Sequence, residues 1–206
     1  MSDLEEKKSL LHRSSNSNSN SSIDTIYTID EKINMIIDLY KSEGNTNYFG
    51  EKVTKTEHMI QCALSAQNDN EEDYIVLACL LHDIGHFLAK DDMGGLGVRN
   101  HGILGYYYLK DLDMDERICY LVEKHVDAKR YLVTIDDKNY DKLSDASKKT
   151  LEYQGGKMSD YELTAMEKDD DFLNILKVRK HDDKGKNKDQ EIPDIETFIP
   201  LIRKYL

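Results

Sequence analysis

Residues 75–86 read IVLACLLHDIGH, an apolar run that ends in two adjacent polar side chains, His82 and Asp83. The run predicts a buried element, although periodicity alone does not separate a helix from a strand here. Burying an imidazole beside a carboxylate is costly unless a cation or a hydrogen-bond network compensates. His86 follows His82 by four residues, so on a continuing helix it faces the same pocket. This stretch therefore predicts a metal ion in the core of the fold.

Length and charge limit what the chain can be. Its 206 residues suit one domain with a proper core. The net charge of -12 argues against a nucleic-acid or anionic-membrane surface, because both need clustered Lys and Arg. The N-terminus has no continuous apolar segment of the secretory type, and no apolar run approaches the roughly 18 residues of a spanning helix. We therefore expect neither nucleic acid nor membrane as a partner.

The cysteines indicate a reducing compartment. Cys62, Cys79 and Cys119 are odd in number, widely spaced and set among apolar neighbours. That pattern argues against a disulfide framework or a thiolate metal site. We expect buried, reduced thiols in a cytoplasmic protein.

The first 22 residues are polar and end in the biased tract SSNSNSNSS at 14–22. Such a segment cannot bury enough apolar surface to offset the entropy lost on ordering. We predict a disordered tail over 1–22, including His12, and a single folded domain over 23–206.

Capping patterns predict where the helices begin. Four pairs have the spacing of a capping box: Thr28 with Glu31, Thr54 with Glu57, Asp113 with Glu116, and Ser159 with Glu162. Further helices are expected from about Glu71 to His86, from His101 onward, from Asp145 to about Gln154 after a Ser144 cap, through Phe172 to Val178, and after Pro193. No alternating pattern of a strand competes with these signals. The fold is predicted to be all-α.

Seven potential metal ligands lie on or beside these helices. They are His58, His82, Asp83, His86, His101, His125 and Asp182. Any one histidine could be an ordinary hydrogen-bonded core residue, but five together favour a site. Nitrogen and oxygen donors without thiolates suit iron, manganese or zinc, and their number exceeds the need of one ion. Two ions bridged by one carboxylate would fit.

The order of these residues resembles a known family signature. His58, His82-Asp83, His101, His125 and Asp182 follow the H…HD…H…H…D order of the HD-domain superfamily in its two-metal form. More narrowly, the chain is similar to HD-domain mixed-valent diiron oxygenases that cleave organophosphonates. The similar stretches are YFGE (48–51), TEH (56–58), LHDIGH (81–86), HVDAKRYL (125–132), LSDAS (143–147), LEYQGG (151–156) and RKHDD (179–183) with Lys186. The resemblance covers about Ile29 to Leu206.

The resemblance implies a helical HD-domain bundle that encloses a dinuclear metal site. The expected cofactors are two iron ions cycling as Fe(II)/Fe(III), and the expected substrates are O2 and a small organophosphonate. One iron would be held by His58, His82, Asp83 and Asp182, and the other by Asp83, His101 and His125. Asp83 would bridge them.

Other residues are expected to bind the substrate. Lys129 follows His125 by four residues, where a cation suits a phosphonate, and Ser147 lies in the first turn after the Ser144 cap, a natural anion site. The resemblance adds His86, Gln154 and Thr150 to the phosphonate contacts. Ordinary surface roles remain the alternative for Lys129, Ser147 and Thr150.

Tyr48 and Glu51 precede the first histidine in a loop that could close over the pocket. The resemblance implies catalytic roles for both, together with Asp83. The matching tyrosine can occupy the open position of an iron until substrate displaces it, and the matching glutamate meets the substrate's ammonium group. Both could instead be a covering aromatic ring and a solvated acid.

His181 departs from the family, since relatives often carry tryptophan before the aspartate. We expect it beside the site or at the surface and not as a ligand. Asp183 is expected to be a supporting or solvated acid, with a one-residue ambiguity against Asp182.

The function expected from the resemblance is O2-dependent cleavage of the C–P bond of a 1-hydroxy-2-aminoethylphosphonate-type substrate, which releases phosphate and an amino acid such as glycine. The alternative is a metal-dependent HD phosphohydrolase that acts on a phosphate ester. A third possibility is a catalytically silent nucleotide sensor or interaction module. Five residues favour the oxygenase, because a plain hydrolase would not require them: Tyr48, Glu51, Lys129, Ser147 and Gln154.

Overall fold

The computed structural model describes residues 27–48 and 50–206. The predicted tail over 1–22, with His12, lies outside the described residues, as does Phe49 of the 48–51 stretch. Within the described part, the all-α prediction is confirmed: the only strand-type pairing is one isolated bridge between Asn47 and Thr54. No helix in these ranges is long and apolar enough to cross a membrane.

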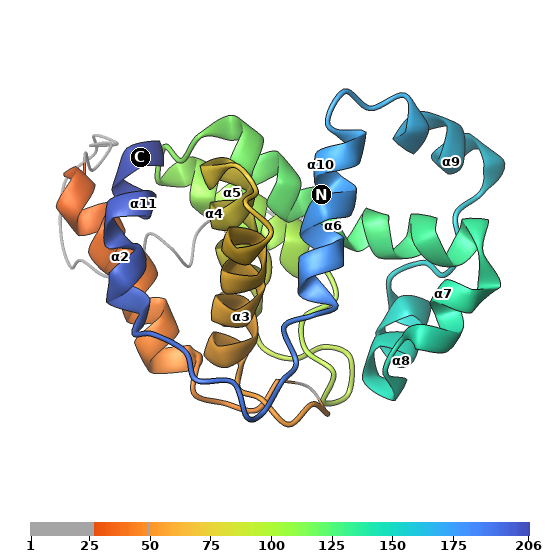
Figure 1. The fold of residues 1–206 in the computed structure, drawn as a ribbon, viewed down its shortest axis with the longest axis horizontal. Helices are drawn as coiled ribbons and strands as arrows, with labels where there is room; N and C mark the ends of the chain where they lie inside the picture. The colour runs from red at the N-terminus through yellow and green to blue at the C-terminus, as the bar shows by residue number, and fades with distance from the viewer. Residues whose placement is uncertain (1–26, 49) are drawn as a thin grey trace, which may run out of the picture.

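The described residues fold into α-helices and two short 3-10 helices. In chain order they are α2 (Ile29–Glu43), α3 (Lys55–Asn68), α4 (Asp73–Leu81), the 3-10 helix η1 (Ile84–Phe87), α5 (His101–Asp111), α6 (Glu116–Ile135), α7 (Asp137–Lys142), α8 (Asp145–Tyr153), α9 (Asp160–Glu167), α10 (Phe172–Asp182), the 3-10 helix η2 (Ile195–Phe198) and α11 (Ile199–Tyr205). Helices α3, α4, α6 and α10 form the centre of the bundle (Figure 1). Helices α2 and α11 lie side by side at one end, and α7, α8 and α9 lie at the other.

The capping patterns in the sequence predicted several helix starts correctly. Thr28, Thr54 and Ser159 each cap a helix through a complete capping box, in which the cap oxygen accepts from the third helical residue and that residue's glutamate accepts from the cap. Ser144 caps α8 by accepting from the Ser147 amide. Each bond satisfies an amide that the helix geometry leaves without a partner.

The predicted Asp113–Glu116 cap is wrong. The N-cap of α6 is Asp115, whose side chain accepts from the Arg117 amide. Asp113 instead adopts a left-handed backbone conformation with φ of 58°. Its carboxylate pairs with Lys32 of α2, a partner far away in the sequence. The long-range ion pair and the turn after α5 therefore override the local capping pattern.

The central helix is shorter than predicted. Instead of continuing from Glu71 to His86, α4 ends at Leu81, and the chain leaves α-helical geometry at Asp83, where φ is -103° and ψ is 10°. The close approach of η1 to α5 explains this turn. A Cβ at Gly85 would lie only 1.9 Å from the His101 carbonyl oxygen, so the two backbones meet where only glycine fits.

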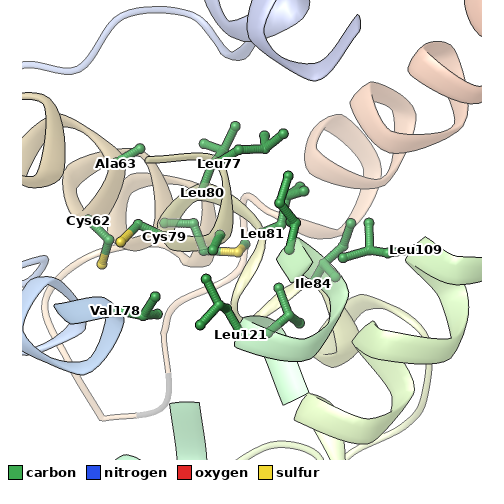
Figure 2. Packing of buried hydrophobic residues seen from close by; sticks show 14 of the residues in the cluster. Cys62, Ala63, Leu77, Cys79, Leu80, Leu81, Ile84, Leu109, Leu121 and Val178 are labelled. Atoms are coloured by element: carbon green, nitrogen blue, oxygen red, sulfur yellow. The ribbon is translucent and has the colours of Figure 1, made fainter. Parts of the chain in front are cut away.

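The core is built around α4. Every residue from Tyr74 to Leu81 is buried, and α3, α6 and α10 pack around them. Figure 2 shows Leu77, Leu80 and Leu81 of α4 close to apolar side chains of neighbouring helices. A helix that is apolar on all sides must be buried on all sides, which explains why periodicity alone did not identify it. The three cysteines are buried and form no disulfide, as expected.

Candidate metal centre

Four histidine side chains converge below the end of α4 in two pairs. In the first pair, His58 of α3 and His82 bring their Nε2 atoms within 3.1 Å. In the second pair, His101 at the start of α5 and His125 of α6 bring theirs within 3.0 Å. All four side chains are almost completely buried.

Asp83 lies between the two pairs and turns one carboxylate oxygen to each. Its Oδ2 lies 3.4 Å from His82 Nε2 and 3.7 Å from His58 Nε2. Its Oδ1 lies 3.3 Å from His101 Nε2 and 3.4 Å from His125 Nε2. A single carboxylate is thus placed to be shared by two neighbouring positive charges.

Asp182, the last residue of α10, completes the first group. Its Oδ1 lies 3.2 Å from His58 Nε2 and 3.7 Å from His82 Nε2. Its other oxygen pairs with the buried Arg179 guanidinium one turn earlier. Asp183 turns outward and pairs with the same arginine, so only Asp182 faces the histidines. This geometry favours Asp182 over Asp183 as the candidate ligand.

The second ring nitrogen of each paired histidine is held by a main-chain carbonyl. The acceptors are Gly185 O for His58, Cys79 O for His82, Val98 O for His101 and Val122 O for His125, at 2.7 to 2.8 Å. A carbonyl can only accept, so each Nδ1 carries the hydrogen, and each neutral ring presents its Nε2 lone pair to the centre. This arrangement is typical of histidines that bind metals.

The donor set fits two cations. With both Nδ1 atoms protonated, the facing Nε2 lone pairs of each pair repel one another unless a positive charge lies between them. Asp83 Oδ2 is buried without a hydrogen-bond partner among the described residues. Although burial lowers the pKa of His82, the Asp83 and Asp182 carboxylates raise it to about 9, so this position favours positive charge. Two bound metal ions would supply that charge to both groups.

Cys62 does not change the class of metal. Its Sγ lies near the first group, 3.9 Å from both ring nitrogens of His58. Burial and the nearby Asp182 charge raise the thiol pKa well above its usual value, which disfavours a thiolate ligand here. The set remains one of nitrogen and oxygen donors, which suits iron, manganese or zinc.

His86 differs from the other four histidines. Its Nδ1 accepts the Val98 amide hydrogen at 3.0 Å, so the hydrogen of the neutral ring is on Nε2. That Nε2 lies 3.8 Å from Asp83 Oδ1, and the ring stacks on His101 with centroids 3.9 Å apart. A protonated nitrogen cannot bind a metal. His86 is close enough to join Asp83 and His101 as a possible ligand group, but its ring is oriented as a hydrogen-bond donor.

A pocket opens onto the second group, and all seven predicted substrate contacts line it. They are Tyr48, Glu51, His86, Lys129, Ser147, Thr150 and Gln154. Met93, Leu96 and Arg179 line it as well, and no role was predicted for them. The sequence could have identified Arg179 as a residue of the site, because it lies one helical turn before Asp182 and a buried aspartate needs a cation nearby.

Lys129 is a buried cation on the pocket wall. It lies on the same face of α6 as His125, and its Nζ donates to Thr150 Oγ1 at 3.1 Å. Burial is the main cause that lowers the pKa of Lys129 to about 7, and the positive charge of Arg179 is the second cause. The alternative of a surface lysine is therefore wrong.

Tyr48 and Glu51 lie where the loop before α3 meets the pocket. The Tyr48 ring stacks on His58, with centroids 4.0 Å apart, and burial raises the pKa of its hydroxyl well above the usual value. The Glu51 carboxylate forms an ion pair with Lys186 at 2.9 Å, and Lys186 also donates to Ser147 Oγ at 3.3 Å. The loop is thus held to the segment after α10.

His181 turns away from the centre. Its Nδ1 lies 2.9 Å from Ser65 Oγ, and its Nε2 lies 3.7 Å from Glu71. The side chain is completely buried, so it packs beside the site between α10 and α3 and is not at the surface.

Comparison with known proteins adds to this geometry. A family model described as the HD domain matches residues 55–159. An uncharacterised protein of Acanthamoeba polyphaga mimivirus is 38% identical over 182 residues, which cover 86% of this chain and 83% of the relative. The [1-hydroxy-2-(trimethylamino)ethyl]phosphonate dioxygenase (glycine-betaine-forming) of Leisingera caerulea is 35% identical over 169 residues, 81% of this chain and 86% of the relative. The hydroxymethylphosphonate dioxygenase of Gimesia maris is 30% identical over 175 residues, 83% of this chain and 86% of the relative.

Proposed function

The chain belongs to the HD-domain family and is related to its phosphonate dioxygenases, and from this premise we propose that it is a diiron oxygenase that cleaves the C–P bond of a 1-hydroxyphosphonate. The substrate we propose is of the 1-hydroxy-2-aminoethylphosphonate type. One O2 per substrate balances the reaction: the C1 carbon loses four electrons and becomes a carboxylate, O2 gains four, and phosphate leaves. With the 2-amino substrate the other product is glycine.

One observation supports this proposal most strongly: Asp83 offers one oxygen to the His58–His82 pair and the other to the His101–His125 pair. Such a carboxylate suits a pair of metal ions, because a single ion would leave one of its oxygens without a positive partner. When bound, two iron ions would activate O2 and take up electrons from the substrate. We assign His58, His82, Asp83 and Asp182 to one ion and Asp83, His101 and His125 to the other.

The pocket residues would bind and orient the phosphonate. Lys129 would supply a cation to its oxygens, Ser147 and Thr150 would donate their hydroxyl hydrogens, and His86 would donate its Nε2 hydrogen. The Gln154 side chain, whose Oε1 is buried without a partner among the described residues, would use its amide group on the same substrate. Holding the reacting carbon at a fixed distance from the centre is the protein's own contribution to the rate.

Glu51 and Tyr48 would meet the opposite end of the substrate. A carboxylate suits the ammonium group of an aminated substrate, and here Glu51 is already paired with Lys186. An incoming ammonium group would replace or share the Lys186 contact. The high pKa of Tyr48 keeps its hydroxyl protonated, so it can donate a hydrogen bond.

Oxygen uptake by the iron-loaded protein tests the proposal. We expect uptake of O2 with 1-hydroxy-2-aminoethylphosphonate and equal amounts of O2 consumed, phosphate released and glycine formed. Phosphate release from a phosphate ester without O2 would favour the phosphohydrolase instead. A purified protein that binds no metal would favour a catalytically silent module.

A further inference from the structure

A second cavity lies behind the wall of the metal pocket. It has a volume of about 310 Å³, and Lys129 and Arg179 line both this cavity and the metal pocket. The other charged side chains that line it are Lys142, Asp183 and Lys186. The two spaces are therefore neighbours that share two cationic side chains.

The lining of this cavity is strongly positive in an otherwise acidic protein. Three lysines and one arginine face a single carboxylate, while the whole chain carries a net charge of -12. Clustered charge of one sign against low-dielectric walls concentrates counter-ions. The cavity thus attracts anions, although most of the protein surface repels them.

Some of these cations are already neutralised and others are not. Arg179 already forms ion pairs with Asp182 and Asp183. It would attract an anion in the cavity mainly through its charge, because both of its terminal nitrogens already donate in these pairs. Lys186 is shared between Glu51 and Ser147. Lys142 makes no ion pair with any residue in the ranges 27–48 and 50–206. An anion in the cavity would give Lys142 its partner.

The N-terminal end of α8 adds to the attraction. Ser144, its cap, lines the cavity, and the positive end of the helix dipole lies beside it. Lysine ammonium groups and a hydroxyl are groups that bind tetrahedral oxyanions in proteins.

We propose that this cavity is a second oxyanion site that takes inorganic phosphate after its release in the metal pocket. Lys129 and Arg179 give a continuous cationic wall, so a phosphate ion moving from one space to the other stays beside positive charge. Any reaction that frees phosphate at the metal centre would use this site, whether or not O2 takes part.

Calorimetric titration of the iron-loaded full chain with inorganic phosphate tests the proposal. We expect two phosphate ions per chain, one in the metal pocket and one in the cavity. Lys142→Glu should weaken the second event at least tenfold and leave the first unchanged, and Lys142→Gln should have a smaller effect of the same kind. Lys138→Glu is the matched control, because Lys138 is exposed on the same helix but does not line the cavity.

Three outcomes would overturn the proposal: a single phosphate per chain in the unaltered protein, equal binding in the Lys142→Glu variant, or the same loss in the Lys138→Glu variant. Circular dichroism of each variant verifies that the helices are intact. The titration measures binding and needs no turnover. A lack of O2 uptake would therefore refute the proposed reaction but leave the evidence for a second phosphate site unchanged.

Discussion

The main-chain carbonyl of Gly185 accepts the Nδ1 hydrogen of His58 at 2.8 Å, although 127 residues separate the two in the sequence. This contact fixes the hydrogen on Nδ1 and turns the Nε2 lone pair toward Asp83 and Asp182. Gly185 fits because it has no side chain: a Cβ there would lie 2.4 Å from Cys62 Sγ and 2.8 Å from the His58 carbonyl oxygen. The loop after α10 thus sets the orientation of a residue on α3.

Gly185→Ala should weaken metal binding. The loop must move to make room, which breaks the hydrogen bond to His58, and loss of such a supporting contact lowers metal affinity by about 10- to 100-fold. Competition with a chelator, followed by iron analysis, measures the change. Lys184→Ala, at the exposed neighbouring residue, is the control and should keep full affinity. Equal affinities in the Gly185→Ala variant and the unaltered protein would contradict the role of this carbonyl.

Asp83→Asn and Asp182→Asn should differ in the number of irons retained. Asp83 faces both histidine pairs and Asp182 faces one, so we expect Asp83→Asn to lose both ions and Asp182→Asn to keep about one per chain. Elemental analysis after purification gives the count. If the two variants lost the same amount of iron, Asp83 would not be the shared ligand.

Lys129 should make substrate binding depend on pH. Burial lowers its pKa to about 7, so the side chain is cationic below that pH and loses its charge as the pH rises through it. KM for the phosphonate should then increase above pH 7, by up to about tenfold per pH unit. In Lys129→Arg this increase should be absent, because a guanidinium stays protonated over the whole range. Matching pH profiles of KM for the two proteins would rule out Lys129 as the titrating group.

Glu51→Gln should discriminate between substrates. A charge-assisted hydrogen bond to an ammonium group contributes about 1.5–3 kcal/mol, which corresponds to roughly 10- to 100-fold in affinity. We expect KM for 1-hydroxy-2-aminoethylphosphonate to rise by that factor, whereas KM for hydroxymethylphosphonate, which has no ammonium group, should be unchanged. Steady-state oxygen uptake with both compounds measures this. A parallel loss with both would show that Glu51 holds the loop and does not select the head group.

Two equivalent capping boxes allow stability and metal binding to be separated. Thr54→Ala and Thr28→Ala each remove an N-cap, so each should lower the free energy of unfolding by about 1 kcal/mol. Of α2 and α3, only α3 carries a proposed metal ligand, His58, in its first turn. We therefore expect weaker iron binding in Thr54→Ala alone, measured by chelator competition beside thermal unfolding. Equal iron affinity in the two variants would show that this cap does not help to position His58.

The helix starts at Thr28, Thr54, Ser144 and Ser159 could be predicted because a capping bond joins residues only three apart. The order of histidines and aspartates likewise indicated the family and two metal ions. Where a distant partner competes, local reasoning failed. Asp113 pairs with Lys32, and Asp115 caps α6 in its place. The backbone of Gly85 meets that of His101, and α4 ends at Leu81 and does not continue to His86.

The sequence alone determined which side chains could bind metal, since that depends on residue chemistry and helical spacing. Tertiary structure decided what each one does there. His86 and His82 are four residues apart and chemically identical, yet the Val98 amide puts the hydrogen of one ring on Nε2, and the Cys79 carbonyl puts that of the other on Nδ1. The Cys79 carbonyl lies one helical turn before His82, whereas the Val98 amide reaches His86 from the connection before α5. The hydrogen position on His86 therefore depends on how that connection packs against η1, which the spacing of the two histidines does not encode.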